Sequence, residues 1–433
     1  IYKVKPKTLL HLMARYEIMK EKQKVFSFWD KLYHFLAFGI YNQRFYTNAW
    51  DRMIAVCQKH YYAARIKELE KEIHDLKGTL ASCRFEEQMK DYAVLSMRMF
   101  RHYLFLRYHN RQRAHYEKAD IRRHSKQFIQ DYPVILSTTH SLRNSLHSEY
   151  MYDYVIMDEA SQVNVTTGFL AFSCARRAVV VGDLKQLSHV VDQEMRNRTD
   201  AVFQEYHMPE AYRYWNHSML RSVTELFPEI PRTLLKEHYR CHPKIIQFCN
   251  QKFYHGQLVI MTEEQKGAPA PLMIYKTVPG NHARHHINQR EIDVIREEVI
   301  PRQQSQMFHT SLGIITPYRN QADALQKELS STAIQADTVD KFQGQERDTI
   351  VLSTVDNDIS DFADDGHRLN VAVSRAVQRL IVVTTGNRPS QDTGLVYPIQ
   401  YVQYINIDIT NSDIYLVFDM LYKPYAQARI KLL

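Results

Sequence analysis

The 433-residue sequence lacks any pair of cysteines in the C-x-x-C spacing. Its five cysteines are scattered and odd in number; they are Cys57, Cys83, Cys174, Cys241 and Cys249. This pattern predicts neither a disulfide framework nor a four-thiolate zinc or iron–sulfur site. We expect reduced and mostly buried thiols.

Long apolar runs are also absent from the sequence. No stretch approaches the roughly 18 to 20 apolar residues of a membrane-spanning helix, and no charged-then-apolar leader stands at Ile1. Hydrophobic residues make up 45% of the chain and charged residues 24%, as in globular proteins. We therefore expect a cytoplasmic protein with no membrane partner, built from two or three domains of about 150 residues.

Helix-breaking residues are scarce in the first third of the chain. Residues 1–130 contain one proline, Pro6, and two glycines, Gly39 and Gly78, which predicts a largely helical segment. The same segment holds 26 Lys and Arg against 13 Asp and Glu, whereas the rest of the chain holds 30 against 35. A basic helical segment could follow nucleic-acid phosphates. A solvated helix face over an apolar core explains the charge equally well.

Within this segment, apolar residues recur at alternating spacings of three and four, the seam of a coiled coil. They are Ile66, Leu69, Ile73, Leu76 and Leu80. Ser82 and the acidic pair Glu86–Glu87 predict a break and a new helix start. We expect an antiparallel helical hairpin with its tip near residues 81–87.

From Asp131 onward the sequence changes to short apolar runs separated by polar segments. Such runs are typical of buried strands in a parallel sheet, and the intervals have room for crossover helices. The sequence therefore predicts an α/β fold. The predicted strands are Val134–Leu136, Tyr154–Met157, Ala178–Val181, Leu312–Ile315, Thr349–Leu352 and Leu380–Val383.

Polar side chains follow two of these predicted strands directly. Asp158 and Glu159 come after the run Tyr154–Met157, and Gly182–Leu187 follows the next strand. Ligands bind at the carboxyl edge of an open parallel sheet. A carboxylate there can hold the Mg²⁺ of a nucleoside triphosphate, and a neighbouring carboxylate can deprotonate water. Alone, a solvated turn explains an Asp-Glu pair better.

Four more polar blocks follow along the chain: Glu237–Ile246, Gly313–Gln321, Thr338–Glu346 and Leu369–Ala376. With Asp158–Gln162 and Gly182–Leu187, they resemble in content and order the motifs of superfamily 1 helicases of the Upf1-like branch. The resemblance covers residues 131–385. It implies two RecA-like parallel-sheet domains, with the helical hairpin inserted in the first, that bind ATP and Mg²⁺ between them.

The resemblance also implies roles for single residues. In the first RecA-like domain, Asp158 would bind Mg²⁺, Glu159 would activate water and Gln186 would sense the γ-phosphate. In the second, guanidinium groups would face the transferred phosphoryl group, a task for a planar and permanently charged side chain. Those groups are Arg240 and Arg375.

Two further residues would contact the nucleoside by the same resemblance. Tyr239 would stack on the adenine, and Glu346 would approach the ribose. Taken singly, a tyrosine such as Tyr239 is more often a core residue, and an arginine is more often part of a surface ion pair.

A single strand of DNA or RNA would cross both domains. By resemblance, its contacts would be Thr138, Thr139, Pro317, Tyr318, Thr338 and Val339. Hydroxyl and backbone contacts to phosphates do not read sequence, which suits movement along any strand. The sequence specifies neither DNA nor RNA, and it identifies no protein partner.

The sequence departs from the family in one major respect, because it contains no G-x-x-x-x-G-K-[ST] phosphate loop. We therefore expect a fragment that lacks the front of the first RecA-like domain. The expected division is 1–130, basic helical insertion; 131–228, remainder of the first domain; 229–390, second domain; and 391–433, a carboxy-terminal extension. The alternatives are an inactive nucleic-acid-binding scaffold and a helicase joined to a nuclease after Leu433.

Two polar clusters predict no metal site. The loop Asp356–Asp365 lacks calcium-loop spacing, and His282, His285 and His286 lie in a polar segment without a matched ligand set.

Overall fold

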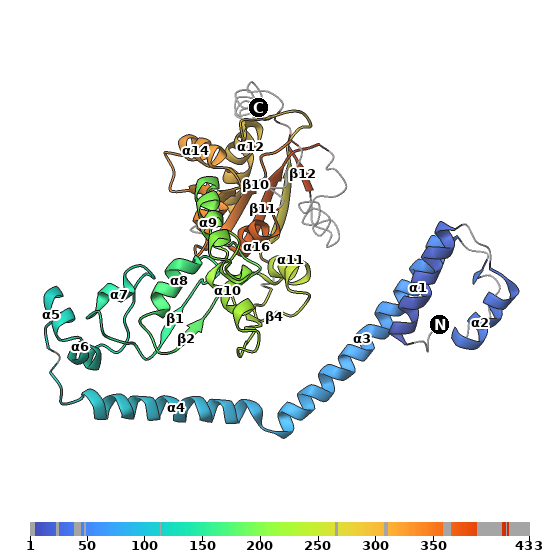
Figure 1. The fold of residues 1–433 in the computed structure, drawn as a ribbon. Helices are drawn as coiled ribbons and strands as arrows, with labels where there is room; N and C mark the ends of the chain where they lie inside the picture. The colour runs from blue at the N-terminus through green and yellow to red at the C-terminus, as the bar shows by residue number, and fades with distance from the viewer. Residues whose placement is uncertain are drawn as a thin grey trace. The chain divides into compact units, whose positions relative to one another are not determined.

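The computed structural model describes residues 5–22, 26–38, 45–46, 49–112, 114–264, 267–306, 311–357, 365–387, 409–412 and 414. The chain divides into two compact units, Ile1–Ala114 and His115–Leu433. Figure 1 shows the helical first unit in blue to cyan and the α/β second unit in teal to red. Among the described residues, no helix combines the length and apolarity needed to cross a bilayer.

The first unit consists of α1 (Pro6–Glu21), α2 (Phe28–Phe38), α3 (Trp50–Ser82) and α4 (Phe85–Tyr108). The predicted helical character is confirmed. A small core joins α1 to the start of α3, where Leu12, Tyr16 and Cys57 are buried among aromatic rings. The ring of Tyr16 meets that of Phe26 edge to face at a centroid distance of 5.7 Å.

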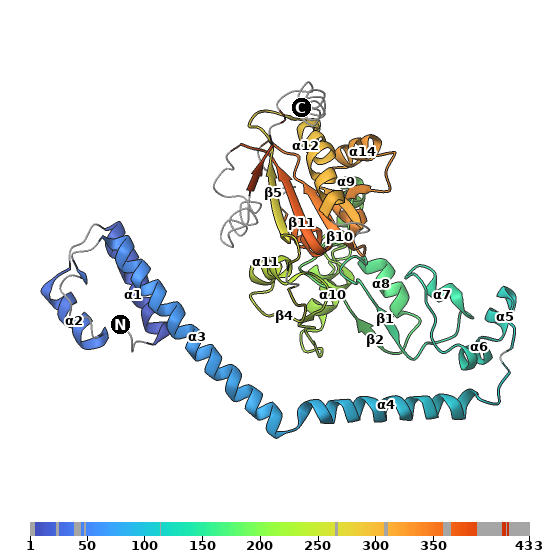
Figure 2. The same ribbon diagram turned by 180° about the vertical axis from the view of Figure 1, so that it is seen from behind.

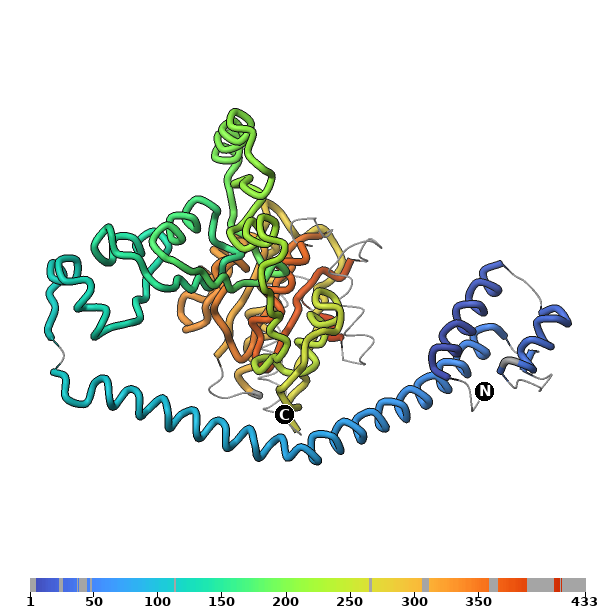
Figure 3. Tube along the Cα trace, turned by 60° about the horizontal axis from the view of Figure 1, so that its bottom comes forward, coloured from blue at the N-terminus to red at the C-terminus, as the bar shows by residue number. Residues whose placement is uncertain are grey.

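The predicted break between the two long helices is confirmed, and it lies at Cys83 and Arg84. Arg84 takes a left-handed conformation, with φ of 50°. The predicted packing of the two arms against each other is not seen: seam residues from Ile66 to Leu80 are 39 to 58% exposed, and α4 has no buried residue. Figure 3 shows α4 leading away from α3 instead of returning along it. A heptad seam is buried only by a facing helix, and spacing alone does not supply one.

The second unit begins with a first lobe that surrounds a short parallel strand pair. Its elements are α5 (Lys118–Arg123), α6 (Ser125–Asp131), α7 (Leu142–Ser145), β1 (Val155–Met157), α8 (Val165–Phe172), β2 (Ala178–Val180), α9 (Gln193–Glu205) and α10 (Met219–Leu226). β1 and β2 pair in parallel, with Val155 opposite Ala178. Both strands were predicted from the sequence.

The predicted strand Val134–Leu136 is wrong. Val134 is 75% exposed and Leu136 is 93% exposed. No described strand pairs with this segment, so its backbone lacks the hydrogen-bond ladder that a strand requires.

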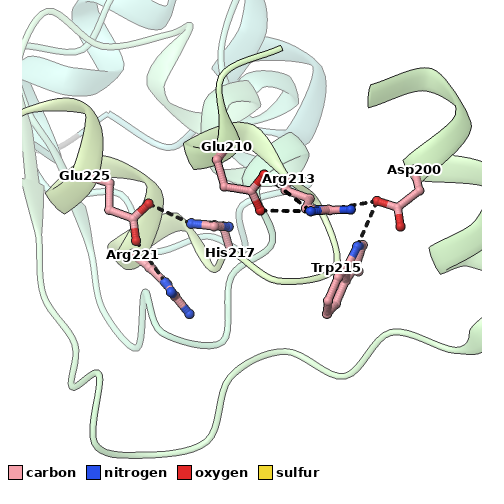
Figure 4. Close-up of polar contacts among 7 residues, drawn as sticks. All are labelled: Asp200, Glu210, Arg213, Trp215, His217, Arg221 and Glu225. Carbon is pink, nitrogen blue, oxygen red and sulfur yellow. Dashed lines mark hydrogen bonds and ion pairs between the residues drawn. The ribbon is translucent and has the colours of Figure 1, made fainter. Parts of the chain in front are cut away.

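A polar cluster anchors α9 to the segment before α10. Asp200 on α9 accepts hydrogen bonds from Arg213 Nε at 3.0 Å and from Trp215 Nε1 at 2.8 Å. Glu210 extends the cluster through an ion pair with Arg213. On α10, Glu225 forms a separate pair of contacts, an ion pair with Arg221 and a hydrogen bond with His217 (Figure 4). The cluster fastens α9 although that helix has no buried residue.

The second lobe is built on a six-stranded parallel sheet. Its strand order is β12-β5-β11-β10-β8-β9. The strands are β5 (Leu272–Lys276), β8 (Leu312–Thr316), β9 (Gln335–Thr338), β10 (Arg347–Ser353), β11 (Ala376–Thr384) and β12 (Ile409–Asn411). The predicted α/β class and the strands within β8, β10 and β11 are confirmed, whereas β5 and β9 were not foreseen.

Helices cover both faces of this sheet (Figure 2). α11 (Pro243–Phe253), α15 (Val339–Phe342) and α16 (Gly366–Ser374) pack on one face, and α12 (Gln289–Val294), α13 (Ile300–Gln306) and α14 (Arg319–Glu328) pack on the other. A π-helical turn, Ile295–Val299, joins α12 to α13. The remaining strands are the short parallel pair β3 (Glu237–His238) and β4 (Val259–Ile260) and the hairpin β6 (Ala283–Arg284) and β7 (Ile287–Asn288).

Candidate active site

The turn after β1 places the Asp158 and Glu159 carboxylates at the carboxyl edge of the first lobe's strands. The Glu159 amide donates to Asp158 Oδ1 at 2.9 Å, and Glu159 has a φ of 50°. Directly after it, the buried Ala160 donates its amide to the Val181 carbonyl at 2.9 Å. The turn is thus fixed by its backbone while both carboxylates stay exposed.

The loop after β2 lies against this turn because residue 182 is a glycine. A Cβ at Gly182 would stand 3.1 Å from the backbone nitrogens of Ala160 and Ser161. In the loop after Gly182, Gln186 Nε2 donates to Asp183 Oδ2 at 3.1 Å, and the Lys185 amide donates to Asp183 Oδ1 at 2.8 Å. The Asp183 carboxylate therefore holds the predicted γ-phosphate sensor in place.

Arg375 enters from the second lobe, at the C-cap of α16. It is 4% exposed, its Nε donates to the Val371 carbonyl at 3.2 Å, and its Nη2 donates to Ser374 Oγ at 3.2 Å. Burial, followed by repulsion from Arg240, lowers the pKa of Arg375, while Glu159 and Glu346 oppose that shift. Among the described residues, Arg375 forms no ion pair with a carboxylate.

Arg240 and Glu346 form an ion pair, Nε to Oε1, at 2.7 Å, and both side chains are about two-fifths exposed. Beside them, the Tyr239 hydroxyl donates to the Glu237 carboxylate, a bond that raises the pKa of Tyr239. Tyr239 is 66% exposed, so its ring is available for stacking.

A cleft of about 980 Å³ opens between the two lobes. Gln186 lines it from the first lobe, and Tyr239, Arg240, Glu346 and Arg375 line it from the second. Small-molecule sites usually measure about 300–1,000 Å³, so the cleft can admit a nucleotide. Asp158 and Glu159 do not line the cleft, but Glu159 lies close enough to Arg375 to act on the pKa of its guanidinium, which it raises.

The predicted nucleic-acid contacts fall on both lobes. Thr138 is exposed and Thr139 half-buried in a loop of the first lobe. In the second lobe, β8 and β9 pair with Thr316 opposite Thr338, so Pro317–Tyr318 and Thr338–Val339 lie at neighbouring strand ends. The Val339 side chain is 3% exposed and belongs to the core, which leaves only its backbone for a ligand.

Three structural features were missed by the sequence analysis. Tyr254 and Asn370 bridge the lobes, the fully buried Glu291 accepts three different donors, and His286 stacks on Tyr318 at a centroid distance of 4.2 Å. The first two depend on contacts between residues more than 60 positions apart, and no local pattern marks them. His285 and His286, which form a turn with φ of 51° and 59°, were considered in the sequence only as metal ligands. No metal-ligand cluster is found in the described part of the chain.

Two family models, each described as an AAA domain, match residues 17–194 and 215–387. The DNA replication ATP-dependent helicase/nuclease dna2 of Schizosaccharomyces pombe is 27% identical over 296 residues, covering 59% of this chain and 20% of that protein. The 5'-3' DNA helicase ZGRF1 of Mus musculus is 28% identical over 255 residues, covering 54% of this chain and 13% of that protein.

An uncharacterized ATP-dependent helicase of Methanocaldococcus jannaschii is 25% identical over 282 residues, covering 60% of this chain and 40% of that protein. The chain therefore spans less than half the length of each of these relatives. The two matched models together extend across the helical unit and both lobes. With six motifs in family order on two RecA-like domains, the chain belongs to the superfamily 1 helicases of the Upf1-like branch.

Proposed function

We propose that this chain is the motor portion of an ATP-dependent helicase that moves along a single nucleic-acid strand. The observation that carries the proposal is the buried Arg375 guanidinium, which faces the cleft without an ion-pair partner among the described residues. Burying an unpaired cation is costly, and an anion entering the cleft would relieve that cost. A polyphosphate is the anion that suits a guanidinium fork.

Each lobe contributes a different part of the chemistry. Asp158 would hold Mg²⁺, which offsets phosphate charge, and Glu159 would accept the proton of the attacking water. Arg375, with Arg240 released from Glu346, would stabilise charge on the transferred phosphoryl group. Gln186 would position the water or the γ-phosphate, Tyr239 would stack on the base, and Glu346 would meet the ribose.

The donor set fits ATP in part. Carboxylates for Mg²⁺, a sensor amide and two guanidinium groups are present, but these 433 residues contain no phosphate-binding loop. The proposal therefore requires such a loop elsewhere in the intact protein. A scaffold that binds nucleic acid without hydrolysing ATP is the second candidate, and the missing loop is what favours it.

Opening and closing of the cleft would move the strand-binding edges of the lobes relative to each other. Thr138 and Thr139 would hold phosphates on the first lobe, and Pro317, Tyr318, Thr338 and the Val339 backbone would do so on the second. Such contacts bind the strand without reading its sequence.

The proposal is tested by the ATPase rate of the full-length protein with and without single-stranded DNA or RNA. Replacing Arg375 with Ala should lower kcat by about 1,000-fold, the scale of a transition-state arginine. Arg176→Ala, at an exposed arginine outside the cleft, serves as the matched control. An intact protein that binds single strands yet hydrolyses no ATP would establish the scaffold instead.

A further inference from the structure

The segment Asp183–Leu187 of the first lobe is fastened to the second lobe by side chains of both. Tyr254, at the end of α11, donates its hydroxyl to Asp183 Oδ2 at 2.5 Å. Asn370 on α16 donates its amide to the Lys185 carbonyl at 2.9 Å and to the Tyr254 hydroxyl at 2.9 Å. These three bonds form one connected chain between the lobes.

Apolar and backbone contacts strengthen the same attachment. Leu187 is 5% exposed and packs within the core of the second lobe, beside residues of α11 and α16. The His367 ring on α16 is hydrogen-bonded to the Leu184 backbone. The segment is therefore held by α16 along most of its length.

The attachment is partly buried, and its central residue Asn370 is fully buried, which makes its hydrogen bonds hard to replace with water. Asn370 is 1% exposed, and burial, followed by the nearby Asp183 carboxylate, raises the pKa of the Tyr254 hydroxyl. Tyr254 therefore stays protonated and can donate. Removing this donor would leave Asp183 with one partner fewer in a partly desolvated place, where unmet hydrogen bonds are costly.

This series of hydrogen bonds leads, at its two ends, to the two groups proposed to act on phosphate, Gln186 and Arg375. Asp183 Oδ2, which accepts from Tyr254, also accepts from Gln186 Nε2 at 3.1 Å. Asn370 lies on α16, and Arg375 caps that helix at its C-terminus. A helix of nine residues moves as a rigid element, so displacing Arg375 would displace Asn370 with it.

We infer that Tyr254 and Asn370 are positioning residues that fix Gln186 of the first lobe relative to Arg375 of the second. The inference rests on the proposed ATPase function. Neither residue needs to touch the nucleotide for this role: Tyr254 acts through Asp183, and Asn370 acts through Tyr254 and the Lys185 carbonyl. The attachment keeps the Gln186 amide and the Arg375 guanidinium in a fixed relative position, so that both contact the same phosphate.

The test is Tyr254→Phe in the full-length protein, which removes only the hydroxyl and keeps the ring. We expect kcat for ATP to fall about 10-fold, the effect of losing about 1.4 kcal/mol of positioning, while KM for ATP and the melting temperature change little. Tyr206→Phe, at a tyrosine that is 66% exposed on the first lobe, is the matched control and should leave all three unchanged.

A double-mutant cycle separates positioning from general damage. Asp183→Ala alone and Asp183→Ala with Tyr254→Phe should show nearly the same kcat, because the hydroxyl then has no carboxylate to hold. Hydrogen exchange of the 183–187 segment should also quicken in Tyr254→Phe, a readout that does not depend on catalysis.

Three outcomes would overturn the inference. One is a Tyr254→Phe protein with kcat within twofold of wild type, and another is a pair of fully additive effects in the cycle. The third is a Tyr254→Phe protein in which KM rises while kcat and the melting temperature fall in parallel, which indicates a structural role. A wild-type protein that hydrolyses no ATP would contradict the proposed function itself. An active wild type with an equally active Tyr254→Phe variant would contradict only the positioning role.

Discussion

The two lobes of the second unit differ greatly in the size and burial of their β-sheets. The second lobe has six parallel strands, and β10 is continuously buried from Thr349 to Ser353. The first lobe has two strands of three residues, and Ile156 in the middle of β1 is 70% exposed. Stability is thus concentrated in one lobe, while the proposed catalytic carboxylates stand on the other.

The first lobe compensates with contacts that are not strand pairing. The turn at Ala160 is fixed by backbone hydrogen bonds, Gly182 allows two loops to touch, and Leu187 is buried in the core of the second lobe. The comparison teaches that the carboxylates are positioned by turn geometry and by attachment to the neighbouring lobe.

The largest expected effect comes from truncating a central strand. Ile350 in β10 is 0% exposed, so Ile350→Ala should lower the free energy of unfolding of the second lobe by about 4 kcal/mol through lost burial and a cavity. The matched change in the other sheet, Ile156→Ala, should cost less than about 0.5 kcal/mol. Denaturant unfolding followed by hydrogen exchange of each lobe measures both. Equal losses would contradict the comparison.

The next effect is a pH dependence of the second lobe's stability that arises from Glu291. Glu291 accepts hydrogen bonds from Ser353, Thr354 and the Val355 amide, but its complete burial raises its pKa to about 7. Between its ordinary pKa near 4.5 and about 7, the folded lobe binds the proton and the unfolded chain does not. Stability should therefore fall as the pH rises through this window and level off above it.

Glu291→Gln removes this titration and serves as its test. The difference in unfolding free energy between variant and wild type should change by about 3 kcal/mol from pH 4.5 to pH 8, in favour of the variant at high pH. A difference that stays constant with pH would show that Glu291 does not titrate in this range.

The smallest expected effect concerns the close contact between two loops of the first lobe at Gly182. Gly182→Ala brings a Cβ to 3.1 Å from two backbone nitrogens, which cannot move as a flexible side chain can. We expect a loss of about 1–2 kcal/mol and faster hydrogen exchange at residues 159–161. Gly78→Ala, in the α3 interior with open space around its Cβ, should instead stabilise its helix by about 0.5–1 kcal/mol. A silent Gly182→Ala would mean that the two loops can separate freely.

Sequence reasoning succeeded where burial leaves a local pattern. The strands β8, β10 and β11 are apolar runs because helices cover both faces of their sheet, whereas β1 and β2 are short apolar runs that stay partly exposed; each of the five was foreseen. β9 was missed because its sequence, Gln335–Thr338, alternates polar and small residues and lies partly exposed at the sheet edge. The segment Val134–Leu136 looked equally strand-like, but the apolar pattern says nothing about whether a pairing strand is present.

For the candidate site, the sequence supplied the residues and their order but not the contacts between lobes. Gln186 was selected from its motif, whereas its dependence on Asp183 and Tyr254 arises from residues 71 positions apart. The expected carboxy-terminal extension, 391–433, lies outside the described residues except for 409–412 and 414, and Ile409 begins β12. The acidic loop Asp356–Asp365 is described only at its ends, where Asp365 caps α16.

The most direct test of the proposed motor is a structure of the full-length protein with Mg²⁺, ADP and aluminium fluoride, which mimics the transferred phosphoryl group. We expect nucleotide in the cleft, with Mg²⁺ held by Asp158 and the fluoride contacted by Arg375 from the opposite lobe. Nucleotide bound away from this cleft, or Asp158 and Arg375 on surfaces that no single nucleotide can span, would contradict it.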